Sequence, residues 1–210
     1  MSNRLEQREK TRSAIMQAAL TLSREKGFPS LSLREVTREA GVAPATFYRY
    51  FVDMEDLGLA LVDEVGLTLR RLMRQARHRI RVGGSVVSTS IETFMMFLDE
   101  SPHLFQLLMG DQAGGPKSFR DALRRERHRF IDELIDDLTQ GQATRDMPLS
   151  HIELISEMMV NLVFMGGIEA LDMNREQRKQ LAEKLVLELR LIFTGSAAWA
   201  QQEKLRKSGR

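Results

Sequence analysis

Apolar residues recur with the 3.6-residue period of an α-helix along nearly the whole chain, and no stretch alternates as a β-strand does. In the first such segment, Ile15, Ala18, Ala19 and Leu22 stand at positions i, i+3, i+4 and i+7. A chain of 210 residues is long enough to bury a sizeable core. The pattern therefore predicts an all-α fold.

Glycine, proline and capping residues divide this periodic pattern into separate helices. Ser32 followed by Glu35 has the spacing of a capping box at a helix start, and Pro44 is a favoured first helical residue. Gly41 and Gly83 are expected to follow helix ends. The predicted helices cover residues 6–26, 32–40, 44–51, 54–82, 85–100, 104–109, 117–140, 150–172 and 175–204. The polar segments 112–116 and 141–148 are expected to be loops.

Two short helices joined at Gly41 form the pattern of a helix-turn-helix between residues 33 and 51. Val36 on the first helix is placed to pack against Phe47 on the second, and Gly41 permits a tight turn. The second helix offers groups suited to phosphates and base edges, namely Ala45, Thr46, Tyr48, Arg49 and Tyr50. An ordinary helical corner with a buried aromatic plug is the alternative interpretation.

Positive charge is concentrated in the N-terminal part of the chain. Residues 1–50 hold nine Lys/Arg and five Glu, whereas the whole chain has a formal net charge of only +2. A basic segment on a near-neutral body favours a polyanionic partner such as duplex DNA. A solvated charged face explains the imbalance equally well.

Composition argues against several other classes of protein. The chain has no cysteine, which excludes disulfides, cysteine-based zinc sites and cysteine nucleophiles. Its four histidines lack metal-binding spacing, and no phosphate-binding glycine loop or nucleophile motif is present. We therefore expect no enzyme activity, no metal and no cofactor. The charged N-terminus and the lack of an 18-residue apolar run predict a cytoplasmic protein with no membrane partner.

The segment L-S-L-R-E-V-T-R-E-A-G-V-A-P-A-T-F-Y-R-Y-F-V-D-M-E-D-L resembles the DNA-binding signature of the tetracycline-repressor (TetR) family. The resemblance covers about residues 8–60 and implies a three-helix DNA-binding domain at 1–52, a six-helix ligand-binding and dimerisation domain at 53–210, and a homodimer. It departs from the family at Ala43, where Ser or Thr is common, and at Met54, where Lys is common. The DNA-binding candidates are Lys10, Arg12, Arg34, Ala45, Thr46, Tyr48, Arg49 and Tyr50.

A closer similarity joins the chain to the FabR/DesT subgroup, whose members control unsaturated fatty acid synthesis. It rests on the segment above, on D-E-V-G-L-T-L-R-R-L-M-R-Q-A-R-H-R-I-R-V-G-G-S-V, and on E-A-L-D-M-N-R-E-Q-R-K-Q-L-A-E-K-L-V-L-E-L-R-L-I. The subgroup implies a repressor that responds to long-chain acyl-CoA or another acyl thioester. The alternative is a TetR-type repressor that senses another hydrophobic molecule, such as a drug, and controls an efflux or catabolic operon.

The central helices are rich in Met and Phe, which suits an irregular apolar pocket and equally suits an ordinary core. The ligand-binding candidates are Phe94, Phe97, Leu98, Phe105, Leu108, Met109, Phe130, Met158, Leu162 and Met165. Several arginines are either phosphate ligands for CoA or solvated helix faces, namely Arg70, Arg71, Arg74, Arg77, Arg120, Arg124 and Arg125.

The last two helices are expected either to form a dimer interface or to bury their apolar residues within one protomer. The interface candidates are Leu154, Ile155, Met158, Leu162, Leu181, Leu185, Leu189 and Ile192. A helical adaptor that binds another protein is the remaining rival to a DNA-binding repressor. The operator, the target genes and the sign of the ligand effect stay open.

Overall fold

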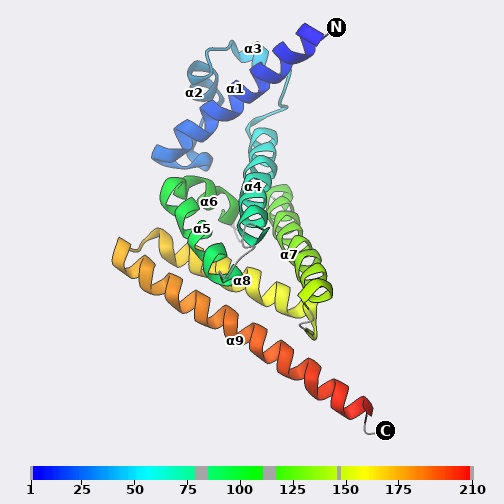
Figure 1. The fold of residues 1–210 in the computed structure, drawn as a ribbon. Helices are drawn as coiled ribbons and strands as arrows, with labels where there is room; N and C mark the ends of the chain where they lie inside the picture. Colours follow the sequence, from blue (N-terminus) through cyan, green and yellow to red (C-terminus); the bar gives the residue numbers. More distant parts are fainter. Residues whose placement is uncertain (1, 79–84, 111–116, 146–147, 209–210) are drawn as a thin grey trace. The chain divides into compact units, whose positions relative to one another are not determined.

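The computed structural model describes residues 2–78, 85–110, 117–145 and 148–208, and this part of the chain holds helices and no strand (Figure 1). The all-α prediction is confirmed. The helices are α1 (Ser2–Lys26), the short 3₁₀ helix η1 (Phe28–Ser30), α2 (Leu33–Glu39), α3 (Pro44–Phe47), α4 (Met54–His78), α5 (Val86–Glu100), α6 (Pro102–Met109), α7 (Lys117–Arg145), α8 (Ile152–Leu171) and α9 (Arg175–Ser208).

The chain divides into two compact units. The first consists of Met1–Thr68 and Ser101–Arg124, and the second of Leu69–Glu100 and Arg125–Arg210. The first unit therefore holds α1 to α3 together with α6 and the starts of α4 and α7. The predicted functional boundary at residue 52 stays a prediction, because packing alone does not show where DNA binding ends.

A small core holds the first unit together. Ile15 and Ala19 of α1, Val36 of α2, Phe47 of α3 and Leu57 of α4 are all completely buried. The start of α4 lies very close to Phe28, because a Cβ on Gly58 would come within 2.6 Å of that ring. Glycine at this position therefore allows the contact.

In the same unit, α1 and α6 meet at a buried histidine. Arg24 Nε donates a hydrogen bond to His103 Nε2 at 3.4 Å. Burial lowers the pKa of His103 below its ordinary value, and the nearby Arg24 guanidinium lowers it further. His103 is therefore neutral at pH 7, which is the state that accepts this hydrogen bond.

In the second unit, α8 and α9 pack along each other and α5 packs against both. Gly166 brings α8 close to α9, since a Cβ there would stand 3.0 Å from Leu185 Cδ1. Close packing of this kind excludes water and fixes the two helices side by side.

Two predicted boundaries are wrong. The expected loop from Gly141 is helical as far as Arg145, because the residues after Gly141 include good helix formers and the space around this glycine is open. The predicted helix 44–51 is an α-helix only as far as Phe47 and continues as turns. The predicted end of the fourth helix at Gly83 and the expected loop 112–116 lie outside the described residues.

Helix α8 is, by length and composition, long and apolar enough to cross a membrane, although the sequence predicted no such segment. An 18-residue window of this 20-residue helix has a mean hydropathy of 1.5, and 44% of that window is buried inside the protein. The helix also carries Glu153, Glu157 and Glu169 and packs against α5 and α9. These features are those of a core helix.

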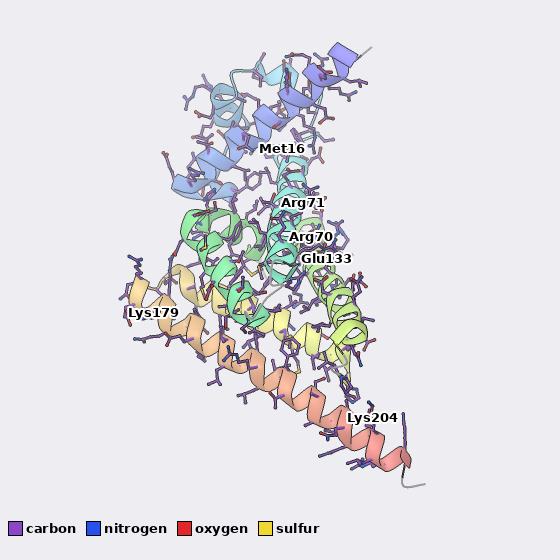
Figure 2. The ribbon with its side chains drawn as sticks, in the orientation of Figure 1. Met16, Arg70, Arg71, Glu133, Lys179 and Lys204 are labelled. Atoms are coloured by element: carbon purple, nitrogen blue, oxygen red, sulfur yellow. The ribbon has the colours of Figure 1, made fainter. Side chains whose placement is uncertain are left out.

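Arginines on α4 face carboxylates on α7 along the second unit, and Arg70 and Glu133 are labelled in Figure 2. Arg70 forms ion pairs with Glu126 and with Glu133, whose Oε1 lies 3.0 Å from Arg70 Nε. Arg74 Nη2 lies 3.5 Å from Glu133 Oε2, and Arg77 Nε lies 2.5 Å from Asp137 Oδ2. We call this series of ion pairs the arginine ladder.

Candidate DNA-binding surface and effector cavity

Helix α2 begins with the predicted capping box. The Glu35 N–H donates to Ser32 Oγ at 3.4 Å, and the Ser32 N–H donates to a Glu35 carboxylate oxygen at 3.0 Å. Hydrogen bonds from Lys26 first, and then from Ser32, lower the pKa of Glu35 to about 2. The carboxylate therefore stays charged, and the helix start stays capped, until the pH falls well below the ordinary Glu value of 4.5.

Helix α2 ends in a Schellman motif that turns the chain toward α3. Gly41 has φ 64°, its N–H donates to Arg38 O at 3.2 Å, and the Val42 N–H donates to Thr37 O at 3.0 Å. A side chain other than glycine is strained at this φ. The predicted role of Gly41 as the tight turn of the helix-turn-helix is therefore confirmed.

A buried aromatic side chain anchors α3. Phe47 is completely buried and packs edge-on against Tyr48, and its ring centroid lies 5.6 Å from that of Phe51. Pro44 occupies the first turn, and Ala43 at the N-cap provides no side-chain hydrogen bond, as its identity predicts. Anchoring through Phe47 leaves the opposite side of the helix facing outward.

That outward side carries several of the predicted DNA-binding residues. Ala45, Tyr48 and Arg49 are exposed, with 62% of Tyr48 accessible, while Thr46 and Tyr50 are half-buried. Lys10 on α1 and Arg34 on α2 are also exposed. The first unit thus presents guanidinium, ammonium, phenol and methyl groups on the exposed side of the helix-turn-helix.

Arg12 has a contact within the protein that the sequence did not reveal. Its guanidinium carbon lies 5.4 Å from the centroid of the Phe51 ring, a cation–π geometry, and the residue is half-buried. This contact ties α1 to the segment after α3. Arg12 is therefore partly engaged within the protein, unlike Lys10.

The second unit contains an apolar cavity of about 110 Å³. Five helices contribute to its wall, and among the lining side chains Ser90 and Arg77 are polar. The lining residues are Leu69, Met73, Arg77, Val86, Val87, Ser90, Ile91, Phe94, Phe130, Leu134, Leu138, Met159, Val160, Val163, Phe164, Leu189 and Phe193. An apolar cavity with a few polar groups is the usual form of a small-molecule site.

Two of the predicted ligand-binding residues, Phe94 and Phe130, line this cavity. Phe97 and Leu98 are buried on α5 and Leu162 is half-buried on α8, and none of the three lines it.

The other predicted ligand-binding residues do not line this cavity either. Met158 and Met165 are exposed on α8, and Phe105, Leu108 and Met109 lie on α6 in the first unit. Composition marks a residue as apolar but does not show which face of a helix it occupies. It therefore could not separate the residues that line the cavity from other apolar residues.

Five of the arginines considered for CoA phosphates fall into two groups, while Arg71 is exposed and Arg120 is half-buried. Arg70, Arg74 and Arg77 belong to the arginine ladder and are paired with carboxylates of α7. Arg125 is exposed, and the exposed Arg124 forms an ion pair with Asp121 at 2.9 Å. The expectation of a solvated face is therefore wrong for Arg70 and Arg77, whose side chains are largely buried.

Sequence reasoning missed Ser90 as a cavity residue, and it considered Arg77 only as a phosphate ligand or a solvated residue. Ser90 stands four residues after Val86 and four before Phe94, so helical spacing places this serine on an apolar face of α5. A polar residue on such a face is an informative signal.

Helices α8 and α9 each carry a series of exposed apolar side chains. On α8 they are Leu154, Met158, Met165 and Ile168, and on α9 they are Leu187, Leu191 and Trp199. Four of the predicted interface residues, Ile155, Leu181, Leu185 and Leu189, are instead buried within the protomer. We call the exposed set the α8/α9 apolar surface.

Two family models match the chain. The model described as bacterial regulatory proteins, tetR family, matches residues 15–61, and the one described as tetracyclin repressor-like, C-terminal domain, matches residues 84–192. The second match alone spans more than half of the chain.

Solved structures share the fold at low sequence identity. GusR of Salmonella enterica has a TM-score of 0.71 at 19% identity, with 88% of this chain and 95% of that chain covered. A tetR-family transcriptional regulator of Streptomyces coelicolor has a TM-score of 0.69 at 21% identity, with coverage of 92% and 85%. The reduced form of E. coli NemR has a TM-score of 0.67 at 19% identity, with coverage of 87% and 96%.

Proposed function

Because the chain belongs to the TetR family of bacterial regulatory proteins, we propose that it is a cytoplasmic transcription repressor that binds its operator as a homodimer. Proteins of this family bind operator DNA, usually as dimers, and are generally not enzymes. The observation that carries the proposal is the helix-turn-helix, in which buried Phe47 and the Gly41 turn hold Tyr48 and Arg49 outward. A dimer places two such corners in major grooves about 34–36 Å apart on a pseudo-palindromic site.

The exposed residues of the corner have separable roles in this proposal. We expect Tyr48→Ala to weaken binding to the preferred operator by about 1–3 kcal/mol and to relax the sequence preference at one position, because Tyr48 is assigned to a base. We expect Arg34→Ala to weaken binding to all duplexes alike and to reduce the salt dependence, because Arg34 is assigned to a phosphate. Fluorescence anisotropy with a duplex recovered by in vitro selection, at several salt concentrations, measures both effects.

Lys179→Ala is the matched control for Arg34→Ala, since it removes one positive charge from an exposed position on α9 in the second unit. Its operator affinity should equal that of the wild-type protein. Unchanged binding by Tyr48→Ala would refute the assignment of Tyr48.

The proposed effector is a long-chain acyl-CoA or a related acyl thioester, and the proposed target genes serve fatty acid synthesis and desaturation. The similarity to the FabR/DesT subgroup supports this effector, as does an apolar cavity whose wall includes the adaptable side chains of Met73 and Met159. Titrating the operator complex with a saturated and a monounsaturated acyl-CoA of equal length tests the proposal. We expect operator affinity to change by about 5- to 150-fold and by different factors for the two chains.

Free CoA is the control in that titration and should leave operator affinity unchanged, because it lacks the acyl chain. The same response to both acyl-CoAs, or a response to neither, would exclude this effector class.

The size of the cavity favours a second candidate, a repressor that senses a smaller hydrophobic molecule. A cavity of about 110 Å³ is smaller than the ~300–1,000 Å³ typical of drug-sized ligands. An engineered apolar cavity of about 150 Å³ takes up benzene. A long acyl chain therefore needs the wall to repack, whereas a compact ligand needs much less change.

A further inference from the structure

Ser90 on α5 is a buried hydroxyl that lines the cavity without a hydrogen-bond partner. The residue is 9% exposed, and its Oγ is buried and has no partner. Serine and threonine hydroxyls inside a helix commonly bond to a carbonyl three or four residues earlier. Thr11, Ser23 and Thr68 do so in this protein, with oxygen–oxygen distances of 2.8–3.0 Å, and Ser90 does not.

The other serines near the start of α5 have partners. Arg190 Nη2 of α9 lies 3.2 Å from Ser88 Oγ and 3.5 Å from Ser85 Oγ. Ser90 stands on the cavity side of the same helix, next to Ile91 and one turn before Phe94. A buried hydroxyl that has lost its hydration without a replacement is unfavourable, so a ligand oxygen in the cavity would supply the missing hydrogen bond.

The charge on the cavity wall is already balanced. Among the lining side chains that the structure describes, Arg77 is the one charged residue, and its Nε is 2.5 Å from the Asp137 carboxylate. An ionised group in the cavity would be a third charge in apolar surroundings, and the described residues of the wall offer it no further counter-ion, which is costly. The wall therefore favours an uncharged occupant.

We infer that the cavity binds an uncharged apolar molecule, or an apolar chain segment, that carries one oxygen atom, and that the Ser90 hydroxyl recognises this oxygen. The inference rests on the proposed role of the cavity as the effector site and adds the chemistry of the occupant. A cavity of about 110 Å³ limits the part held near Ser90 to roughly the size of a benzene ring. An acyl thioester meets the description through its carbonyl oxygen, and small phenols, alcohols and ketones meet it as well.

Phenol and toluene test the inference because they have the same number of heavy atoms and differ by a hydroxyl in place of a methyl group. The dissociation constants of both are measured by calorimetry on the full-length wild-type protein, Ser90→Ala and Ser156→Ala. The ratio of the toluene dissociation constant to the phenol dissociation constant should fall by about 2- to 13-fold in Ser90→Ala. This fall corresponds to the loss of one net hydrogen bond to phenol. The comparison of ratios cancels the different hydrophobicities of the two probes.

Ser156→Ala is the matched control. Ser156 is a completely buried serine on α8 whose hydroxyl also has no partner, but it does not line the cavity. The toluene-to-phenol ratio of dissociation constants in Ser156→Ala should equal that of the wild-type protein. Both variants should remain folded in thermal unfolding, because alanine favours a helix more than serine does.

An unchanged ratio in Ser90→Ala, an equal fall in Ser156→Ala, or failure of both probes to bind the wild-type protein would overturn the inference. The operator titration with acyl-CoAs is independent of this result. A changed ratio together with no acyl-CoA response would retain Ser90 as the recognition group and reject the acyl thioester as effector.

Discussion

Arg70→Met is expected to lower the free energy of unfolding by about 3–5 kcal/mol. Arg70 and Glu126 form an ion pair whose side chains are 8% and 3% exposed, and the Arg70 guanidinium carbon also lies 5.7 Å from the centroid of the Phe130 ring. Methionine keeps the length of the side chain but removes the buried cation of the Glu126 carboxylate, which then pairs with the more exposed Arg129, whose Nη1 lies 2.7 Å from Glu126 Oε2. Denaturant unfolding at one fixed protein concentration measures the change, since the proposed dimerisation would make stability depend on concentration.

Two further variants show whether the cost comes from the buried charge. Arg70→Met combined with Glu126→Met removes both charges and should recover most of the lost stability, because a buried ion pair often equals well-packed apolar groups in stability. Arg74→Met is the matched control from the same ladder. Arg74 is 50% exposed, so its removal should cost about 0–1 kcal/mol. A large loss in Arg74→Met, or no recovery in the double variant, would contradict this explanation.

Leu191→Glu is expected to convert the proposed dimer to a monomer and to weaken operator binding by about 10²- to 10⁴-fold. Leu191 is 62% exposed on α9, within the α8/α9 apolar surface. A glutamate in the centre of a dimer interface buries a charge without a partner. A monomer binds one half-site only and loses the high effective concentration of the second DNA-reading corner. Sedimentation velocity gives the oligomeric state and anisotropy gives the operator affinity.

Met96→Glu controls for the introduction of a charge. Met96 is an exposed apolar residue on α5, outside the α8/α9 apolar surface, and its replacement should leave a dimer with wild-type operator affinity. If Leu191→Glu remained a dimer with full affinity, the interface would have to lie elsewhere on the molecule.

The helix-turn-helix could be predicted from the sequence because its signals are local. The Ser32–Glu35 capping box, the positive φ of Gly41 and the first-turn position of Pro44 each depend on a few neighbouring residues. Helix periodicity also predicted most helix boundaries to within a few residues. Gly141 was misplaced because a glycine near a helix end stops a helix only if the chain turns there.

The cavity could not be predicted because it depends on five helices meeting in space. Met158 and Met165 are apolar residues of α8, as Met159 and Phe164 are. The first pair is nevertheless exposed, whereas the second pair is buried and lines the cavity. The arginine ladder was equally hidden, since Arg70 and Glu126 are far apart in the sequence. Only Ser90 carried a readable signal, as a polar residue on an apolar helical face.

The arginine ladder has a mechanical consequence for the second unit. Its pairs follow the same order on both helices, from Arg70 with Glu126 and Glu133 to Arg77 with Asp137, so the pairing fixes the register of α4 against α7. A slip of one turn in one direction would bring Arg74 opposite Arg129, and a slip in the other would bring Arg77 opposite Gly141.

Either slip replaces at least one of these ion pairs with repulsion or with an unmatched charge. Gradual sliding of these two helices is therefore unfavourable, and when an occupant expands the cavity, the ladder segments of α4 and α7 should rotate or shift as one rigid pair.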